Sequence, residues 1–315
     1  MNRETWLNLL RWFDSDAGQT GGDSTRFNWL RMLPFLFLHG GCLLVLVAGV
    51  SATSVIVCVT LFLVRMFAIT AFYHRYFAHK SFRTGRLTQF LFAVIGNTSM
   101  QRGALWWAAH HRTHHQHADQ ERDLHSPVRR GFWWSHVGWF SCDAGFKTDY
   151  SRINDWSRFP ELVWLNRYDS LVPILYGLTL WCTGAWLEAR HPALGTSGLQ
   201  LLVWGFFIST VCLFHATVTI NSLGHMWGKR RYDTPDSSRN NPWLALLTLG
   251  EGWHNNHHRW PASARQGFYW WEIDISWYLL KLMSWTGLIW DLRPVPGRVL
   301  AEGRNRERLR ERRDE

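Results

Sequence analysis

The sequence predicts an all-α integral membrane protein with four transmembrane helices in two hairpins, capped by a cytoplasmic helical domain. Three observations lead to this prediction. Four apolar segments are each long enough to cross a bilayer. Basic residues are concentrated outside these segments, where Lys and Arg commonly mark the cytoplasmic side. The 22 Trp residues suit a membrane–water interface, where aromatic side chains are enriched.

The four expected spans form two pairs, each joined by a short connector. They cover residues 32–50, 54–73, 170–187 and 199–221. Each is about 20 residues long, the length a helix needs to cross the hydrocarbon core. Residues 49–54 are the expected tight turn of the first pair, and EARHPALGTSG joins the second pair. Arg65 lies inside the second span, where a charge must face protein or reach the interface.

Positive charge is distributed unevenly between the two sides of the expected membrane domain. The chain carries 34 Lys and Arg against 24 Asp and Glu, a formal net charge of +10. The two short connectors carry at most Arg190, and nearly all other basic residues lie in the remaining segments. Both termini and the histidine-rich blocks are therefore expected on the cytoplasmic side. This topological explanation of the charge makes a nucleic-acid binder the weaker reading.

The chain is expected to form one domain with two polar extensions. Residues 1–31 are an N-terminal polar or interfacial segment, 32–293 are the domain, and 294–315 are a charged C-terminal tail. The tail is expected to be either a solvated helix or disordered. Residues 87–109 are apolar but interrupted by polar side chains, so we expect one interfacial or re-entrant helix there.

Three histidine clusters lie outside the expected spans. They are HRYFAH (His74 and His79), HRTHH (His111, His114 and His115) and HNNHH (His254, His257 and His258). In an HxxHH sequence on a helix, the three imidazoles share one face and can converge on one volume. Imidazole is a ligand for zinc, copper, iron and nickel. Eight such nitrogens are too many for one ion and suit a site for two.

The ligand types exclude several other metal sites. No Cys lies near a cluster, which disfavours a structural zinc site. The Glu-x-x-His pairs of soluble di-iron bundles are also missing from the sequence. A metal transporter would be expected to carry ionisable ligands within its spans, whereas these clusters lie outside them. Two imidazole-bound metals point to oxygen activation, although the ligands alone do not distinguish iron from zinc.

The order and spacing of these clusters resemble the membrane fatty acid desaturases, and most of all their Δ9 branch of stearoyl-CoA and acyl-lipid desaturases. RGFWWSHVGW (130–139), INSLGHMWG (220–228) and GEGWHNNHH (250–258) carry the same resemblance. It implies two irons and a ninth histidine ligand, His225, with Asn221 bound through a water. One iron would take His74, His79, His111, His115 and His257. The other would take His114, His225, His254 and His258.

The resemblance implies an O2-dependent enzyme that inserts a cis double bond, at Δ9, into a long saturated acyl chain. No side-chain base can remove hydrogen from an unactivated CH2–CH2 pair, so a redox metal centre must supply the oxidant. Glu251 is expected to hydrogen-bond a ligand imidazole. The expected substrate contacts are Trp107, Trp134 and Trp253, from a Trp-rich part of the cap.

The partners expected from the sequence are an acyl carrier, O2, membrane lipid and an electron donor. The carrier is acyl-CoA or a membrane acyl-lipid. Animal acyl-CoA desaturases share an Arg-Asp pair before the second cluster, where this chain has Ala109 and His110, which weakens the case for CoA. The chain has no haem-binding HPGG, Cys cluster or GxGxxG, so a separate ferredoxin, rubredoxin or small haem cytochrome with its reductase is expected.

Two alternatives remain open within this chemistry, a hydroxylase and an acetylenase, because the clusters do not decide the product. The other seven histidines are expected to be structural or to orient ligands. They are His39, His110, His117, His125, His136, His191 and His215.

Overall fold

The computed structural model describes residues 3–17 and 24–314, and it is built almost entirely of helices. Four helical segments are long and apolar enough to cross a membrane: Trp29–Ala48, Ala52–Ala78, Leu171–Arg190 and Gly198–Met226. The prediction of four spans in two hairpins is therefore confirmed. The second span continues five residues beyond its expected end at Tyr73 and takes in part of the first histidine cluster.

Each hairpin is made of shorter helical stretches in series. The first consists of α2 (Trp29–Cys42), α3 (Val45–Ala48), α4 (Ala52–Phe67) and the π-helix η1 (Ala68–Ala78). The second consists of α10 (Leu171–Arg190), η5 (Pro192–Leu194), α11 (Gly198–Leu201), the π-helix η6 (Leu202–Ile208), α12 (Ser209–Asn221) and α13 (Leu223–Met226). The turn of the first hairpin ends at Ser51, which caps α4 by accepting a hydrogen bond from the amide of Ser54.

Large apolar side chains on the outside of the spans remain exposed, as a surface against lipid chains requires. Phe37 and Ile56 in the first hairpin and Leu178 in the second are examples. The charged Arg65 instead points inward and is buried. Its guanidinium donates to the hydroxyls of Ser209 and Thr210, which ties α4 to α12. This is the inward-facing arrangement that a charge within a span requires.

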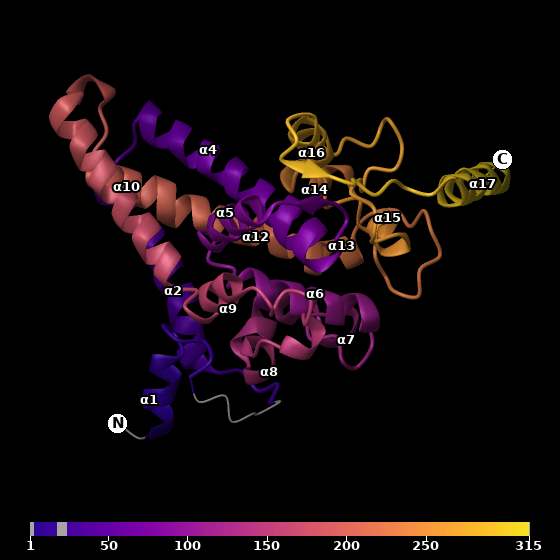
Figure 1. Ribbon diagram of the computed structural model, residues 1–315, viewed down its shortest axis with the longest axis horizontal. Coiled ribbons are helices and arrows are strands. Elements are labelled where there is room, and N and C mark those ends of the chain that lie inside the picture. The colour runs from indigo at the N-terminus through magenta and orange to yellow at the C-terminus, as the bar shows by residue number, and fades with distance from the viewer. Residues whose placement is uncertain (1–2, 18–23, 315) are drawn as a thin grey trace.

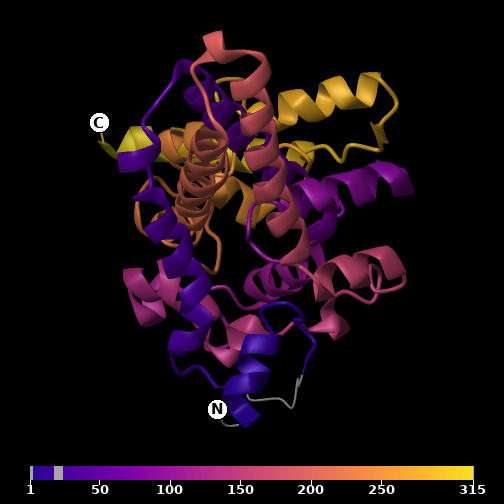
Figure 2. The ribbon, with the colours of Figure 1, turned by 90° about the vertical axis from the view of Figure 1, so that its left-hand side faces the viewer.

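The cap is assembled around the ends of η1, α12 and α13, and α1 lies next to the start of α2 (Figures 1 and 2). Before the second hairpin its elements are α1 (Arg3–Leu10), β1 (Arg83–Thr84), α5 (Arg86–Asn97), α6 (Ala104–His117), α7 (Pro127–Arg130), η2 (Trp134–Gly138), η3 (Trp139–Ser141), α8 (Asp143–Phe146), η4 (Tyr150–Arg152) and α9 (Pro160–Arg167). After it they are α14 (Pro242–Leu247), α15 (His254–Arg259), α16 (Ile275–Trp285), β2 (Ile289–Trp290) and α17 (Gly297–Asp314). Strands β1 and β2 pair antiparallel and join the two halves of the cap.

The expectation of one helix over residues 87–109 is wrong. The chain forms α5 and α6 with a sharp break between them. Met100 and Arg102 in this break have φ values of 57° and 68°, in the left-handed region that a right-handed helix cannot contain. The break redirects the chain so that α6, which carries the second histidine cluster, packs against η1.

The charged C-terminal segment is helical, one of the two expected alternatives, but its first turns pack on the cap. Val299 of α17 is buried against Tyr232 and Phe268. Further along, Glu302 pairs with Arg259 and Glu307 pairs with Arg231. Helix α17 is seen at the right of Figure 1, where it extends away from α15. Its charged sequence suits this partly solvated position.

Candidate metal centre

The first histidine cluster is positioned by a change of helix type at the end of the second span. Residues 68–78 form the π-helix η1, in which the amide of His79 donates to the carbonyl of His74 at 3.2 Å. This is the i to i+5 hydrogen bond of a π-helix. In an α-helix each residue turns the chain by about 100°, so side chains at positions i and i+5 would point in directions about 140° from one another. The wider turn of η1 brings the rings of His74 and His79 to the same side.

The second and third clusters are presented by ordinary helical spacing. His111, His114 and His115 lie on one face of α6, and His254, His257 and His258 lie on α15. The turn before α15 requires Gly250, whose φ is +128° and where an added Cβ would collide with Asp274. That turn places Glu251 beside the first cluster and starts α15 at His254.

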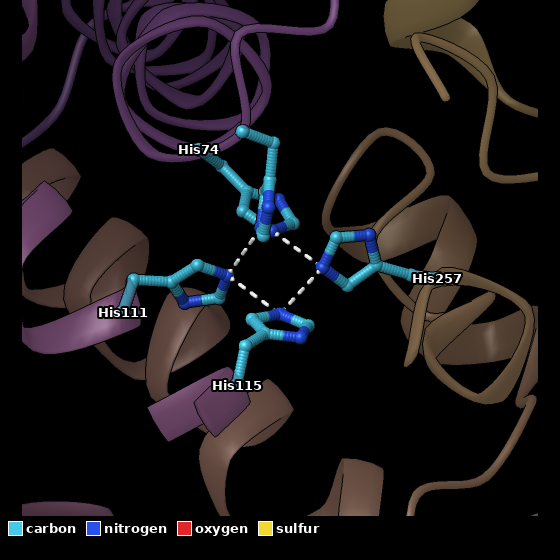
Figure 3. Close-up of side chains that lie close together, drawn as sticks. His74, His111, His115 and His257 are labelled. Carbon is cyan, nitrogen blue, oxygen red and sulfur yellow. Dashed lines mark hydrogen bonds between the residues drawn. The ribbon is translucent and has the colours of Figure 1, made fainter. Parts of the chain in front are cut away.

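The structure brings nine histidines together in two groups of candidate ligands. One holds His74, His79, His111, His115 and His257, and the other holds His114, His225, His254 and His258. Within each group one candidate ligand atom per residue lies within 4.8 Å of all the others. Figure 3 shows four side chains of the first group pointing toward one common point. The groups have the same members as the two sets that the resemblance implies.

The spacing of the ring nitrogens in the first group fits metal ligation. The Nε2 atom of His257 is 2.9 Å from that of His74 and 2.8 Å from that of His115. The Nε2 atoms of His111 and His79 are 2.9 Å apart. Two nitrogens bound at about 2.1 Å to one ion, 90° apart, would be separated by about 3.0 Å. In the second group, the Nε2 atoms of His254 and His225 are 3.1 Å apart.

Buried or half-buried carboxylates contact the far side of several of these rings. His114 Nδ1 is 3.0 Å from Asp123, His258 Nδ1 is 3.0 Å from Asp236, and His225 Nδ1 is 3.5 Å from Asp119. His74 Nδ1 contacts Glu251, as the sequence predicts. A neutral ring that donates from Nδ1 has only a lone pair at Nε2. Lone pairs that face one another are stabilised by a cation between them, so these rings suit a metal.

The carboxylates are distributed unevenly over the two groups. Among the described residues, three contact the four-histidine group and one, Glu251, contacts the five-histidine group. Burial alone would lower the pKa of His114, but the nearby carboxylates, Asp123 foremost and then Asp236 and Asp119, together outweigh burial and raise it. Burial alone would raise the pKa of Asp236, but His258 holds it well below its usual range. The four-histidine group therefore has more carboxylates beside it than the five-histidine group.

A cavity of about 780 Å³ leads from the first group toward the membrane-spanning helices. Trp107, His111 and Asn221 line its inner end. Its walls are mostly aromatic and aliphatic side chains, among them Phe140 and Phe214. A pocket of this size and lining suits an apolar small molecule. A molecule bound there would lie beside His111 of the first group.

Comparison with known proteins gives the family. The fatty acid desaturase family model matches residues 51–286. The chain belongs to the fatty acid desaturase family. It is 35% identical to the sn-1 stearoyl-lipid 9-desaturase of Anabaena variabilis over 84% of this chain and 93% of that one. It is 36% identical to the Delta-9 acyl-lipid desaturase 1 of Arabidopsis thaliana over 85% and 84%. It is also 34% identical to the acyl-CoA C20 Delta5-desaturase of Anemone leveillei over 87% and 85%.

The protein is thus an oxidoreductase of the membrane, and the desaturase keeps its histidine groups outside the lipid-exposed parts of the spans. Of the three Trp residues expected at the substrate, Trp107 lines the cavity and stacks on His111 with ring centroids 4.8 Å apart. Trp134 and Trp253 are not among the cavity-lining residues. Their indole N–H groups donate instead to the carbonyls of Leu124 and Ile273.

The three Asp residues beside the second group are the functional candidates that the sequence did not reveal. Asp119 and Asp123 follow the second histidine cluster, and Asp236 lies in a loop. Their proximity to HRTHH was a weak signal for the first two, but only folding brings Asp236 to His258. His125, expected to be structural or to orient a ligand, lies 3.3 Å from Asp123 through its Nδ1 and lines the cavity.

His39 and His215 of the spans and His136 of the cap form a hydrogen-bonded series. His39 Nε2 is 2.9 Å from His215 Nε2, and His215 Nδ1 is 3.0 Å from His136 Nε2. His136 Nδ1 then contacts the Ser222 hydroxyl at 3.0 Å. These hydrogen bonds tie α2, α12 and η2 together. This is consistent with the structural role expected for His39 and His215.

Asp123→Asn is expected to weaken metal binding by the desaturase about 10- to 100-fold. The amide would no longer offer a charged acceptor to the Nδ1 proton of His114, so the ring would be less basic and less firmly oriented. Metal content after dialysis against graded chelator measures the effect. Asp149→Asn, at an exposed carboxylate paired with Arg152, is the matched control. Equal metal retention in both variants would contradict the role of Asp123.

The metal-free desaturase is expected to lose stability as pH falls from about 7.5 to 5. Burial lowers the pKa of His258 to about 4, despite the opposing Asp236, and lowers those of His254 and His257 well below 6.5. Unfolded histidines titrate near 6.5, so below this pH the unfolded chain takes up protons that the folded chain does not. The melting temperature of the metal-stripped protein should therefore fall over this range. A constant melting temperature would contradict the lowered pKa values.

Proposed function

We propose that the protein is an O2-dependent di-iron desaturase that inserts a cis double bond at Δ9 into a long-chain saturated fatty acyl chain. The observation that carries the proposal is that the five-histidine group, which adjoins the four-histidine group through His115 and His258, contributes His111 to the lining of the apolar cavity. The nine histidines would hold two iron ions, with Asn221 reaching one of them through a water. Nitrogen ligation of this kind is compatible with iron.

In the proposed reaction, a CH2–CH2 pair becomes a cis CH=CH pair while O2, two electrons and two protons become two waters. The iron pair supplies the oxidant. The chain's own residues hold the substrate still and keep water out, since no side chain is basic enough to remove these hydrogens. Trp107, packed against both His74 and His111, would hold the reacting carbons beside the centre.

The proposed acyl carrier is acyl-CoA or a membrane acyl-lipid. Relatives named for stearoyl-lipid and for acyl-CoA substrates are both about equally similar to this chain. The residues that this chain has in place of the Arg-Asp pair of animal acyl-CoA desaturases favour an acyl-lipid as the carrier. Ala109 is buried, and the ring of His110 contacts the carbonyl of Lys147 at 3.0 Å. Neither of these two residues therefore offers CoA the charged side chain that Arg or Asp would provide.

Electrons are proposed to come from a separate ferredoxin, rubredoxin or small haem cytochrome with its reductase. The cap, the histidine groups and both termini are proposed to lie on the cytoplasmic side, where such donors are found, and the distribution of basic residues supports this orientation. Nucleic acid is not an expected partner. The net charge of +10 would attract an acidic donor.

Turnover with an acidic donor is therefore expected to weaken with salt. Raising the ionic strength from about 0.01 M to 0.15 M shortens the Debye length from about 30 Å to 8 Å. The kcat/KM for the donor should fall several-fold, while a donor with its acidic surface residues neutralised should respond less. Donor kinetics that are insensitive to salt would contradict electrostatic attraction.

Product analysis tests the proposal. Cells that contain a suitable donor and express the wild type should accumulate monounsaturated chains, and mass spectrometry of cleavage products gives the bond position. An alkene is lighter than its parent chain by two hydrogens, whereas an alcohol is heavier by one oxygen, and an acetylenase would leave a triple bond. An unchanged profile with the donor confirmed present would overturn the proposal.

A further inference from the structure

We propose that the substrate is a membrane glycerolipid whose acyl chain passes sideways from the bilayer into the cavity, between α2 and α10. This inference rests on the proposed desaturation and specifies the carrier and the route. Three features of the described residues support it: where the cavity opens, which polar groups surround the opening, and where the cavity leads.

The cavity opens on the lipid-facing side of the spanning helices. Leu36 on α2 and Ile174 on α10 both line the cavity and are 47% and 52% exposed. Phe37 on α2 also lines it and is exposed. The same side chains thus face the cavity and the surface that contacts acyl chains. An acyl chain can enter here without leaving an apolar environment, which is favourable.

Helices α2 and α10, on either side of the opening, both pack against the fourth span, Gly198–Met226. Helix α2 packs against η6 and α12, and α10 packs against α11 and η6. A Cβ added at Gly177 on α10 would meet the ring of Phe206 on η6 at ordinary van der Waals distance, so the two helices lie close together here, and Phe206 also lines the cavity. The back wall is therefore closed by the second hairpin, while the front between α2 and α10 faces lipid.

Charged groups line the cavity at the cap end of these spans. Arg31, two residues into α2, donates to Asp143 at 3.0 Å through Nε, and Arg102 donates to Asp169. Both guanidiniums lie over the ring of Phe146, at 4.0 Å and 3.8 Å from its centroid. Arg31, Arg102 and Asp169 all line the cavity, as does Arg11.

These groups lie at the level where a lipid keeps its ester and head group. A guanidinium carries five N–H donors, and one carboxylate accepts only some of them. The fixed guanidiniums of Arg31 and Arg102 can therefore donate further hydrogen bonds to ester carbonyl or head-group oxygens. A lipid with these contacts would extend its chain along the apolar walls toward Trp107 and His111.

A soluble thioester fits this opening less well. Its acyl chain would come from water, and its carrier would remain in water. The opening instead has exposed apolar side chains of two spanning helices on its flanks, so a water-borne carrier would have to lie against the bilayer. A glycerolipid already lies there with its head group at the interface.

Adjacent positions on α10 provide a matched test of the route. Ile174 lines the cavity, whereas Leu175 has nearly the same exposure, 51%, and is not among the lining residues. A photoreactive p-benzoylphenylalanine is placed at either position. The protein is then reconstituted in palmitoyl-oleoyl phosphatidylcholine with a minor fraction of distearoyl phosphatidylglycerol. This readout requires neither iron nor an electron donor.

We expect adducts at position 174 to be enriched in the distearoyl lipid over its share of the bilayer, and adducts at position 175 to follow the bulk composition. Bulk composition at both positions would overturn the proposed route. In parallel, Ile174→Trp should reduce desaturation of the reconstituted lipid at least tenfold, and Leu175→Trp should change it less than twofold.

Activity on stearoyl-CoA separates the possible failures. If the wild type desaturates stearoyl-CoA and not the reconstituted lipid, or if Ile174→Trp leaves lipid desaturation unchanged, the glycerolipid route is wrong while the proposed function stands. If the loaded wild type desaturates neither substrate with a working donor, the proposed function is wrong. Adduct enrichment at position 174 would then still identify the opening as a lipid site.

Discussion

His257→Ala is expected to abolish desaturation, with a loss of at least about 100-fold. The Nε2 atom of His257 lies 2.9 Å from that of His74 and 2.8 Å from that of His115, and the ring is buried. Removing it would open one side of the five-histidine group. Even changes beside a ligand commonly cost 10- to 100-fold, so loss of a ligand should cost at least as much. Fatty-acid profiles and the iron content of purified protein measure both effects.

Two further variants control this experiment. His114→Ala removes a member of the other group and should have a comparable effect on the profile. His191→Ala removes a ring in the connector between α10 and α11, where it packs against Trp186, and should leave activity near the wild-type level. Wild-type levels of unsaturated chains from His257→Ala would exclude the five-histidine group as an essential metal site.

Arg75→Met is expected to destabilise the protein by about 3–5 kcal/mol, the typical result of removing one partner from a buried ion pair. Arg75 is 1% exposed and lies between Glu251, at 3.0 Å, and Asp274, at 2.9 Å. Without the guanidinium, two buried carboxylates lose their countercharge. One of them, Glu251, also contacts His74, so metal retention should fall as well.

Thermal unfolding in detergent and metal content measure these two effects of Arg75→Met. Arg83→Met is the matched control, because Arg83 is 74% exposed in its pair with Asp291, at 3.4 Å. Exposed pairs contribute little to stability, so this change should barely move the melting temperature. Equal melting temperatures for the two variants would contradict the structural role of Arg75.

The positions of the spans could be predicted because crossing a bilayer depends mainly on local properties. Length and apolar character are sufficient, since all backbone hydrogen bonds of a spanning helix are satisfied within it. The break between α5 and α6 was missed for the opposite reason. Its left-handed Met100 and Arg102 are not residue types that signal such a conformation, and packing of α6 against η1 maintains it.

The arrangement of the histidine clusters was likewise predictable only in part. The sequence by itself determined that His111, His114 and His115 share a face, because helical geometry converts i, i+3 and i+4 spacing into proximity. The same geometry would separate His74 from His79. They meet because α4 continues as a π-helix, which the spacing did not predict. His225 was found only through the resemblance, since a lone histidine carries no spacing signal.

What only the tertiary structure decided are the relations between distant segments. It brings Asp236 to His258 and Glu251 to His74, and it separates Trp134 and Trp253 from the cavity while Trp107 lines it. It also brings Leu36 of α2 and Ile174 of α10 into the lining of one cavity. Local sequence largely sets where helical segments form because helix formation depends on neighbouring residues, whereas these contacts, like the break between α5 and α6, depend on how the elements pack against one another.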